Sequence, residues 1–262
     1  MGYNKIIKYG DYLELYEYDK NILKLGRSKR RRKRIIDNKD MGISGENSLS
    51  KRRLGKRQDN ARRASLAFRR LVGANLGSDS GQYARPVLIT LTYGDNFTDL
   101  KGAYGHLSSF IQSFRYKYGK IFKYAAVPEF QKRGAVHFHA LVWGLPSELL
   151  LSERQTRTIA RTWEHGFVYL KETDGNEKLS FYLSKYMAKA FIDPRLKNQK
   201  SYVASRNMLR PVIQSGFSPV WPVLEDYEIQ NDTPLVDKTY GTKYLGKGRY
   251  RLFKTSKINL KE

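Results

Sequence analysis

The chain has 262 residues, of which 40% are hydrophobic, enough for one sizeable domain with appendages or for two small ones. Its 49 Lys and Arg against 25 Asp and Glu give a formal net charge of +24, which favours a polyanionic partner. Nucleic acid is a better candidate for this partner than a membrane surface. The absence of cysteine excludes disulfides and thiolate catalysis, and no apolar run is long enough to span a bilayer. We therefore expect a cytoplasmic protein with no membrane partner.

The N-terminal part of the chain is strongly basic. Residues 1–26 are rich in tyrosine and have no assigned role, and residues 27–72 form a basic segment interrupted by a linker-like stretch over 37–50. A solvated surface helix over 51–70, or a nuclear localisation signal in the six-cation run, are the alternatives to DNA contact. Because clustered cations neutralise phosphates, we expect DNA contacts from Lys29, Arg30, Arg31, Arg32, Lys33, Arg34, Lys51, Arg52 and Arg53.

Residues 86–213 have the composition and periodicity of a globular domain. A β-branched run predicts a central strand over 87–93. The order β-α-β-β-α-β-α-β, with an antiparallel hairpin at its centre, predicts an α+β fold with a ferredoxin-like split β-α-β sheet and helices on one face. Residues 214–262 are assigned only to short strands and turns. The other predicted elements are a helix over 99–118, hairpin strands over 121–130 and 135–143, a helix over 152–163, a strand over 166–172, a helix over 178–191 and an extended segment over 201–213.

Two of the four histidines, His137 and His139, lie two residues apart in an apolar run. Alternate side chains of a strand share a face, so their Cα atoms are roughly 6–7 Å apart and their rings project together. The polar connection over 131–135 predicts a hairpin that places Glu129 opposite His137 on the same face. A single strand histidine is usually structural, and we interpret His106 and His165 so. Two imidazoles and a carboxylate leave open coordination positions and fit manganese, zinc or iron, and magnesium less comfortably.

A second group of polar side chains lies on the predicted helix over 178–191. Tyr182, Lys185, Tyr186 and Lys189 fall on one helical face, while a separate apolar stripe supplies core packing. Tyrosines beside a core stripe are commonly structural. A phenol becomes a nucleophile only when its anion is stabilised, which the two ammonium groups and a nearby metal would do.

Three blocks together resemble the HUH endonucleases: residues 88–93, then His137-Phe138-His139, then the repeated Tyr-x-x-Lys of 182–189. The likeness covers about 86–213 and is greatest to rolling-circle replication initiators of small single-stranded DNA phages and bacterial plasmids. Residues 205–211 also resemble the end of that domain in phage-type members, and Arg206 within them is an expected DNA contact.

The resemblance implies a site-specific nick in single-stranded DNA at a replication origin. His137, His139 and Glu129 would hold Mg²⁺ or Mn²⁺, and a tyrosine would attack the scissile phosphate, leaving a 5′-phosphotyrosyl link and a free 3′-hydroxyl. Tyr186 matches the nucleophile and Tyr182 the partner that cleaves and rejoins after one circuit. Lys185 and Lys189 would position DNA or the metal. The implied partners are a host helicase and a host DNA polymerase in the bacterial cytoplasm.

Two departures and two alternatives accompany this interpretation. The phosphate-loop-like run over 241–248 ends in glycine where a metal-binding Ser or Thr belongs, so it is a chance match. The long basic N-terminal segment is not part of the family's motifs. A transposase or relaxase of the same fold would share the chemistry, and a basic nucleic-acid-binding protein without catalysis is the remaining alternative.

Overall fold

The computed structural model describes residues 3–19, 44–76, 85–118, 123–145, 153–176, 178–216, 233–242 and 245–255. Within these ranges, the structure describes only the backbone of residues 3, 44–54, 56, 118, 153–156 and 186. The chain divides into two compact units, one that joins Met1–Asn60 with Val212–Glu262 and one that comprises Ala61–Pro211. Among the described residues, no helix has the length and apolar character needed to cross a membrane.

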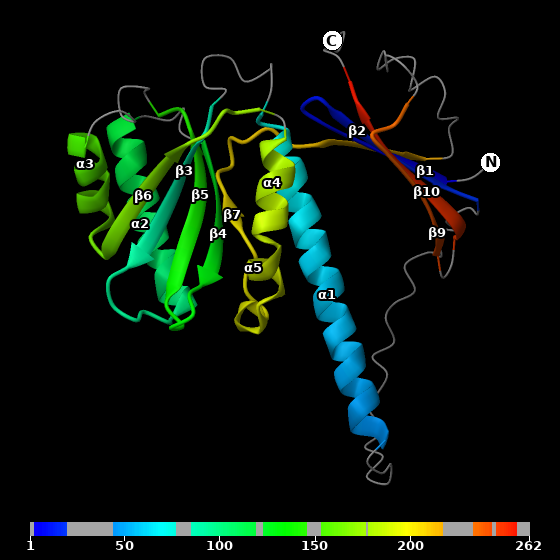
Figure 1. The fold of residues 1–262 in the computed structure, drawn as a ribbon, viewed down its shortest axis with the longest axis horizontal. Coiled ribbons are helices and arrows are strands. Elements are labelled where there is room, and N and C mark those ends of the chain that lie inside the picture. Colours follow the sequence, from blue (N-terminus) through cyan, green and yellow to red (C-terminus); the bar gives the residue numbers. More distant parts are fainter. Residues whose placement is uncertain are drawn as a thin grey trace. The chain divides into compact units, whose positions relative to one another are not determined.

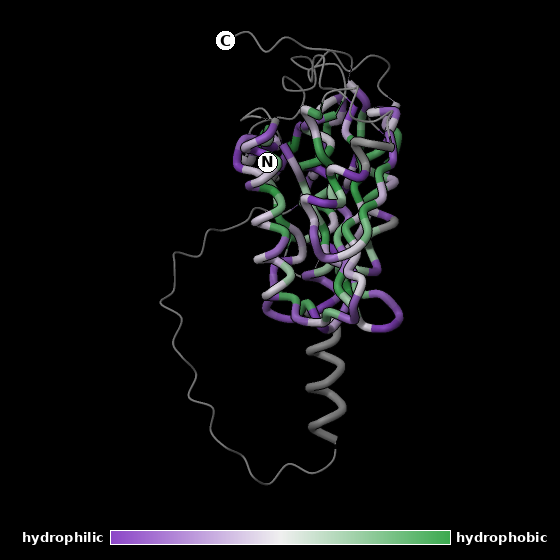
Figure 2. The backbone as a smooth tube through the Cα atoms, turned by 90° about the vertical axis from the view of Figure 1, so that its left-hand side faces the viewer, coloured by the Kyte–Doolittle hydropathy of each residue, from purple (hydrophilic) through white to green (hydrophobic). Residues whose placement is uncertain are grey.

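The unit Ala61–Pro211 is built on a five-stranded antiparallel sheet in the order β6-β3-β5-β4-β7 (Figure 1). Its apolar and β-branched runs become strands because their alternate side chains pack on helices. Figure 2 shows that hydrophobic and hydrophilic stretches alternate along the backbone. The α+β class is thereby confirmed. The strands are β3 (Val87–Tyr93), β4 (Lys123–Phe130), β5 (Val136–Trp143), β6 (Gly166–Glu172) and β7 (Val203–Ala204).

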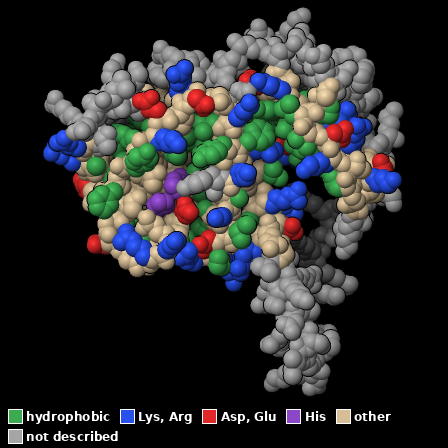
Figure 3. Space-filling view, viewed as in Figure 1, with side chains coloured by type: hydrophobic (Ala, Val, Ile, Leu, Met, Phe, Trp, Pro, Cys, Tyr) green, Lys and Arg blue, Asp and Glu red, His purple; other side chains and the backbone are tan. Residues whose placement is uncertain are grey.

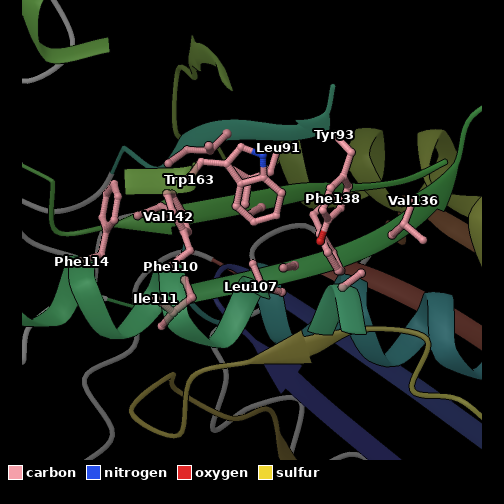
Figure 4. Packing of buried hydrophobic residues seen from close by; sticks show 14 of the residues in the cluster. Leu91, Tyr93, Leu107, Phe110, Ile111, Phe114, Val136, Phe138, Val142 and Trp163 are labelled. Carbon is pink, nitrogen blue, oxygen red and sulfur yellow. The ribbon is translucent and has the colours of Figure 1, made fainter. Parts of the chain in front are cut away.

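One face of this sheet is covered by α2 (Leu100–Tyr118) and α3 (Glu153–Trp163). Phe138 and Val142 of β5 point toward α2, where Leu107, Phe110 and Ile111 meet them (Figure 4). All five side chains are at most 4% exposed. The helical spacing in 99–118 and the alternation in 135–143 therefore predicted the two sides of this core.

The opposite face also carries helices, whereas the sequence predicted a layer on one face only. From Ala61 onward α1 (Ser44–Gly73) packs there together with α4 (Leu179–Tyr186) and α5 (Ala188–Ile192). The basic segment has an apolar stripe as well as its cations, and Phe68 and Val72 of that stripe are fully buried. The helix already begins at Ser44, so the linker expected over 37–50 is helical in its second half because extending a formed helix is inexpensive.

Two short helices replace the single one predicted over 178–191. Met187 has φ −83° and ψ −1°, away from the ψ of about −42° typical of a helix, and α4 therefore ends before it. Its N–H still donates to the Leu183 carbonyl at 2.8 Å, and the Phe191 N–H donates to the Met187 carbonyl at 3.2 Å. The chain thus continues in the same coil, and Pro194–Leu196 adds a 3₁₀ turn.

The other unit contains a second antiparallel sheet, ordered β8-β1-β2-β10-β9, which joins strands from both ends of the chain. Glu14 is fully buried in it and accepts hydrogen bonds from the Tyr9 and Tyr16 hydroxyls, each at 2.9 Å. Two acceptor oxygens are thus satisfied where an unpaired carboxylate would be costly. The strands are β1 (Tyr3–Tyr9), β2 (Tyr12–Tyr18), β8 (Val212–Gly216), β9 (Val236–Thr242) and β10 (Gly246–Lys254).

Gly166, at the start of β6, has a backbone conformation that only glycine adopts easily. Its φ is +150°, and a Cβ placed there would overlap backbone atoms of Thr92 and Gly94. We expect Gly166→Ala to lower the free energy of unfolding by about 2 kcal/mol or more, measured by urea titration. Gly105→Ala on α2, where a Cβ meets no neighbouring atom, is the matched control and should be neutral or stabilising. Equal losses in the two variants would contradict this account.

Candidate active site

Glu129, His137 and His139 are brought together by two adjacent strands. β4 pairs with β5 so that Glu129 lies directly opposite His137, the register that the hairpin predicts. Their side chains lie on the sheet face that also buries Leu141 and Trp143, because alternate residues of β5 share a face. Figure 3 shows histidine side chains at the surface on this side of the molecule.

Each of the three side chains contributes one atom to the point where they converge. The Nε2 atoms of His137 and His139 are 3.0 Å apart, and Glu129 Oε2 lies 2.8 Å from His139 Nε2 and 3.7 Å from His137 Nε2. The side chains of His139 and His137 are 8% and 15% exposed, and that of Glu129 is 37% exposed. The group is therefore anchored in the sheet with its carboxylate partly open to solvent.

Threonines of β3 orient both imidazole rings. Thr92 lies opposite His137 and Thr90 opposite His139, with Oγ1 to Nδ1 distances of 3.4 Å and 3.2 Å. When each Nδ1–H donates to its threonine, both Nε2 atoms present lone pairs to the same point. Converging lone pairs repel unless a proton or a cation lies between them.

The charge of Glu129 completes a donor set that fits a metal ion. Hydrogen bonds with the His137 ring, and after it with the His139 ring, hold the pKa of the Glu129 carboxyl well below its usual range. This group is therefore an anion at neutral pH. Two imidazole nitrogens and one carboxylate oxygen all lie within 4.8 Å of one another. Three protein ligands with open positions are typical of catalytic rather than structural metal sites.

The threonine contacts lead to an expected effect on metal affinity. Thr90→Val keeps the size of the side chain but removes the hydroxyl 3.2 Å from His139 Nδ1. We expect it to weaken Mn²⁺ binding about 10- to 100-fold by isothermal titration calorimetry, because the ring loses the partner that sets its tautomer. Thr162→Val on α3, whose hydroxyl donates to the Thr158 carbonyl, is the matched control. The same dissociation constant in both variants would remove the threonine from the site.

The helix with the predicted nucleophiles packs on the face that carries the histidines. Leu183 and Met187 are 1% and 2% exposed and join the same core cluster as Val127, Leu141 and Trp143. Tyr182 is 59% exposed on α4, and Lys185 and Lys189 are exposed on α4 and α5. Tyr186 ends α4, and its side chain lies outside the described residues.

The expected DNA contacts are only partly described. Residues 29–34 lie outside the described ranges, and Lys51, Arg52 and Arg53 belong to α1 with side chains that are not described. Arg206 is exposed in the turn that follows β7. The structure therefore neither groups these cations nor separates them.

His106 and His165 occupy an aromatic cluster in place of a ligand set, in line with their structural interpretation. Their rings stack with centroids 3.9 Å apart, and Tyr93 Oη lies 2.9 Å from His106 Nδ1. Burial, and secondarily Asp99, raises the pKa of the Tyr93 phenol, so it remains a neutral donor. Burial lowers the pKa of His165, and the neighbouring His106 adds to that effect.

Sequence reasoning missed four side chains on the histidine face: Thr90 and Thr92, which contact the rings, and Phe167 and Tyr169 of β6. The signal was present as alternation within two runs, since Thr90 and Thr92 alternate with Leu91, and Phe167 and Tyr169 with Val168. Only the pairing of β3 with both neighbours shows that these residues share the face of the candidate metal ligands.

Comparison with known proteins gives one finding that bears on the role of this unit. No curated protein and no solved structure matches the chain. Residues 86–191, which include the histidine pair, Glu129 and both helix tyrosines, match the model of the family described as replication-associated protein ORF2/G2P.

Proposed function

We propose that this protein initiates rolling-circle replication by nicking single-stranded DNA with a tyrosine, in the manner of the HUH endonucleases. The observation that carries the proposal is the convergence of Glu129, His137 and His139 on the sheet face where α4 packs. The match of residues 86–191 supports a role in DNA replication. A binding protein without catalysis would not need three converging ligand atoms.

In the proposed reaction the Tyr186 phenolate oxygen attacks the scissile phosphorus. A P–O bond to tyrosine forms, the bond to the 3′-oxygen breaks, and that oxygen leaves as a 3′-hydroxyl after taking up a proton. His137, His139 and Glu129 would hold Mg²⁺ or Mn²⁺, which supplies Lewis-acid stabilisation of the phosphate charge when bound. Lys185 and Lys189 are the candidates to favour the phenolate, because a neighbouring cation lowers the pKa of a phenol.

The second tyrosine accounts for completion of the cycle. Tyr182 precedes Tyr186 by one helical turn, so a second phenol can attack after the displaced strand has been copied around the circle. The 3′-hydroxyl released by this second cleavage then attacks the first 5′-phosphotyrosyl link. A phosphodiester forms, the first tyrosine leaves, and the displaced strand is closed into a circle. A host helicase and polymerase would supply unwinding and synthesis, and the basic residues 29–34 and 51–53 and Arg206 would hold the DNA phosphates.

The test is a covalent-adduct assay on the full chain. The protein is incubated with Mn²⁺ and a pool of single-stranded DNA labelled at either the 3′ or the 5′ end, then resolved on a denaturing gel. The 3′-labelled strand should migrate with the protein, whereas the 5′-labelled strand should be shortened and extendable by a polymerase. Chelation of the metal should abolish both products. Retarded DNA on a native gel without any adduct would instead identify a non-catalytic binding protein.

A further inference from the structure

We propose that Phe167 and Tyr169 form a stacking platform for unpaired bases of the DNA strand held at the metal site, an inference that rests on the proposed function. β6 is an edge strand of its sheet, and these two aromatic rings are 73% and 64% exposed. They are separated by Val168, which points to the opposite face and packs on the α2–α3 core. The two rings therefore project together from one face.

That face is the one that carries the metal ligands. Phe167 lies opposite Thr92, which lies opposite His137, and His137 lies opposite Glu129, so one row of side chains crosses four strands. Tyr169 begins the next row, through Thr90 to His139. Two interstrand spacings separate each aromatic residue from a histidine, about 10 Å. A strand whose phosphate is held at the ligands can thus lay neighbouring bases over β6.

The platform remains open because the helical layer on this face is centred on other strands. The cluster formed with α1, α4 and α5 contains residues of β4 and β5, and Leu88 is its member from β3. Phe167 and Tyr169 are not part of that core. Two adjacent large rings that are exposed beside a candidate catalytic site favour a binding role, whereas aromatic residues scattered singly over a surface need no explanation.

Charge favours single-stranded nucleic acid as the occupant over an apolar partner. The chain has a formal net charge of +24, and Lys171 follows Tyr169 on the same face and is exposed. Arg133 belongs to the connection between β4 and β5, and its guanidinium reaches the end of β3, where it donates to the Gly94 carbonyl at 3.0 Å and to that of Tyr93. Aromatic rings interleaved with cations are the usual means of holding unpaired bases and their phosphates.

The test separates base stacking from phosphate contact. Binding of dye-labelled oligothymidylate, and of the same backbone made of abasic sites, is measured by fluorescence anisotropy with Mn²⁺. The chain carries Tyr182→Phe and Tyr186→Phe as background, so that the metal site is kept and no cleavage occurs. Phe167→Ala and Tyr169→Ala should each weaken binding of oligothymidylate about 5- to 150-fold and leave binding of the abasic strand unchanged. Phe167→Trp and Tyr169→Trp should restore affinity. Tyr116→Ala, which removes a 96% exposed tyrosine of α2, is the matched control and should alter neither strand.

Each other outcome overturns the platform. Equal losses on both strands would indicate a general effect on the fold, and unchanged binding would show that the rings do not touch bases. If the alanine variants have a lower mass than the wild-type chain by light scattering, and their DNA binding is intact, the two rings belong to a surface that binds a second copy of the chain. If the wild-type chain forms an adduct while the alanine variants bind like wild type, only the platform fails. If the wild-type chain binds no single-stranded DNA, the proposed function fails with it.

Discussion

His139→Ala is expected to reduce nicking at least about 100-fold and to abolish the rise in melting temperature that Mn²⁺ produces. The variant removes one of the two nitrogens, 3.0 Å apart, that converge beside Glu129. A bound metal contributes several kcal/mol of charge stabilisation at a phosphate, and each 1.36 kcal/mol corresponds to a factor of ten in rate. Cleavage is measured on a denaturing gel, and metal binding by the difference in melting temperature with and without Mn²⁺.

The control for this variant is a histidine outside the ligand set. His165→Ala removes a ring from the aromatic cluster around Tyr93 and will change the baseline stability, but the shift caused by Mn²⁺ should persist. His137→Ala removes the other imidazole of the candidate ligand set, at a position that is 15% exposed and therefore better tolerated by the fold. Undiminished cleavage by both His137→Ala and His139→Ala would eliminate the metal from the proposed reaction.

Tyr186→Phe is expected to lower covalent-adduct formation by about 10³-fold or more while leaving affinity for single-stranded DNA within about twofold of wild type. The substitution removes only the hydroxyl, and loss of a nucleophile has effects of this size in other enzymes that form covalent intermediates. Tyr182→Phe should still form the first adduct but fail to transfer the strand in a second cleavage. Single-turnover adduct yield and the yield of closed circles separate the two steps.

Tyr116→Phe supplies the control for the hydroxyl substitutions, since this residue is almost fully exposed on α2. It should change neither yield. If Tyr182→Phe alone abolishes the first adduct, the roles of the two tyrosines are reversed. If neither tyrosine is needed, the nucleophile belongs to another part of the chain and the resemblance to HUH endonucleases has misled the assignment.

The local elements of the Ala61–Pro211 unit could be predicted from sequence because each has its own periodic signal. β3 and β6 have the predicted bounds, Val87–Tyr93 and Gly166–Glu172. The pairing of Glu129 with His137 was also predictable, since a short connection leaves a hairpin few registers. Local patterns therefore sufficed for the three metal-ligand candidates.

Pairings between distant strands could not be predicted in the same way. Thr90 and Thr92 contact the histidines because β3 lies beside β5. Phe167 and Tyr169 share the face of the histidines because β3 lies between β6 and β5. Local sequence periodicity does not predict which strands distant in the chain become neighbours in the sheet. The second helical layer was missed for a related reason, because the cations of α1 obscured an apolar stripe that packs through Phe68 and Val72.

The sheet that joins both ends of the chain has a consequence for biosynthesis. The guanidinium of Arg251 in β10 donates a hydrogen bond to the carboxylate of Glu17 in β2, a residue 234 positions earlier. At roughly 5–20 residues per second, a ribosome needs about 12 to 47 s to make that interval. Until β8 has been made, β1 and β2 have only each other as partners in this sheet, and an isolated hairpin is marginally stable. The sheet is therefore completed only after the strands of the Ala61–Pro211 unit have been synthesised.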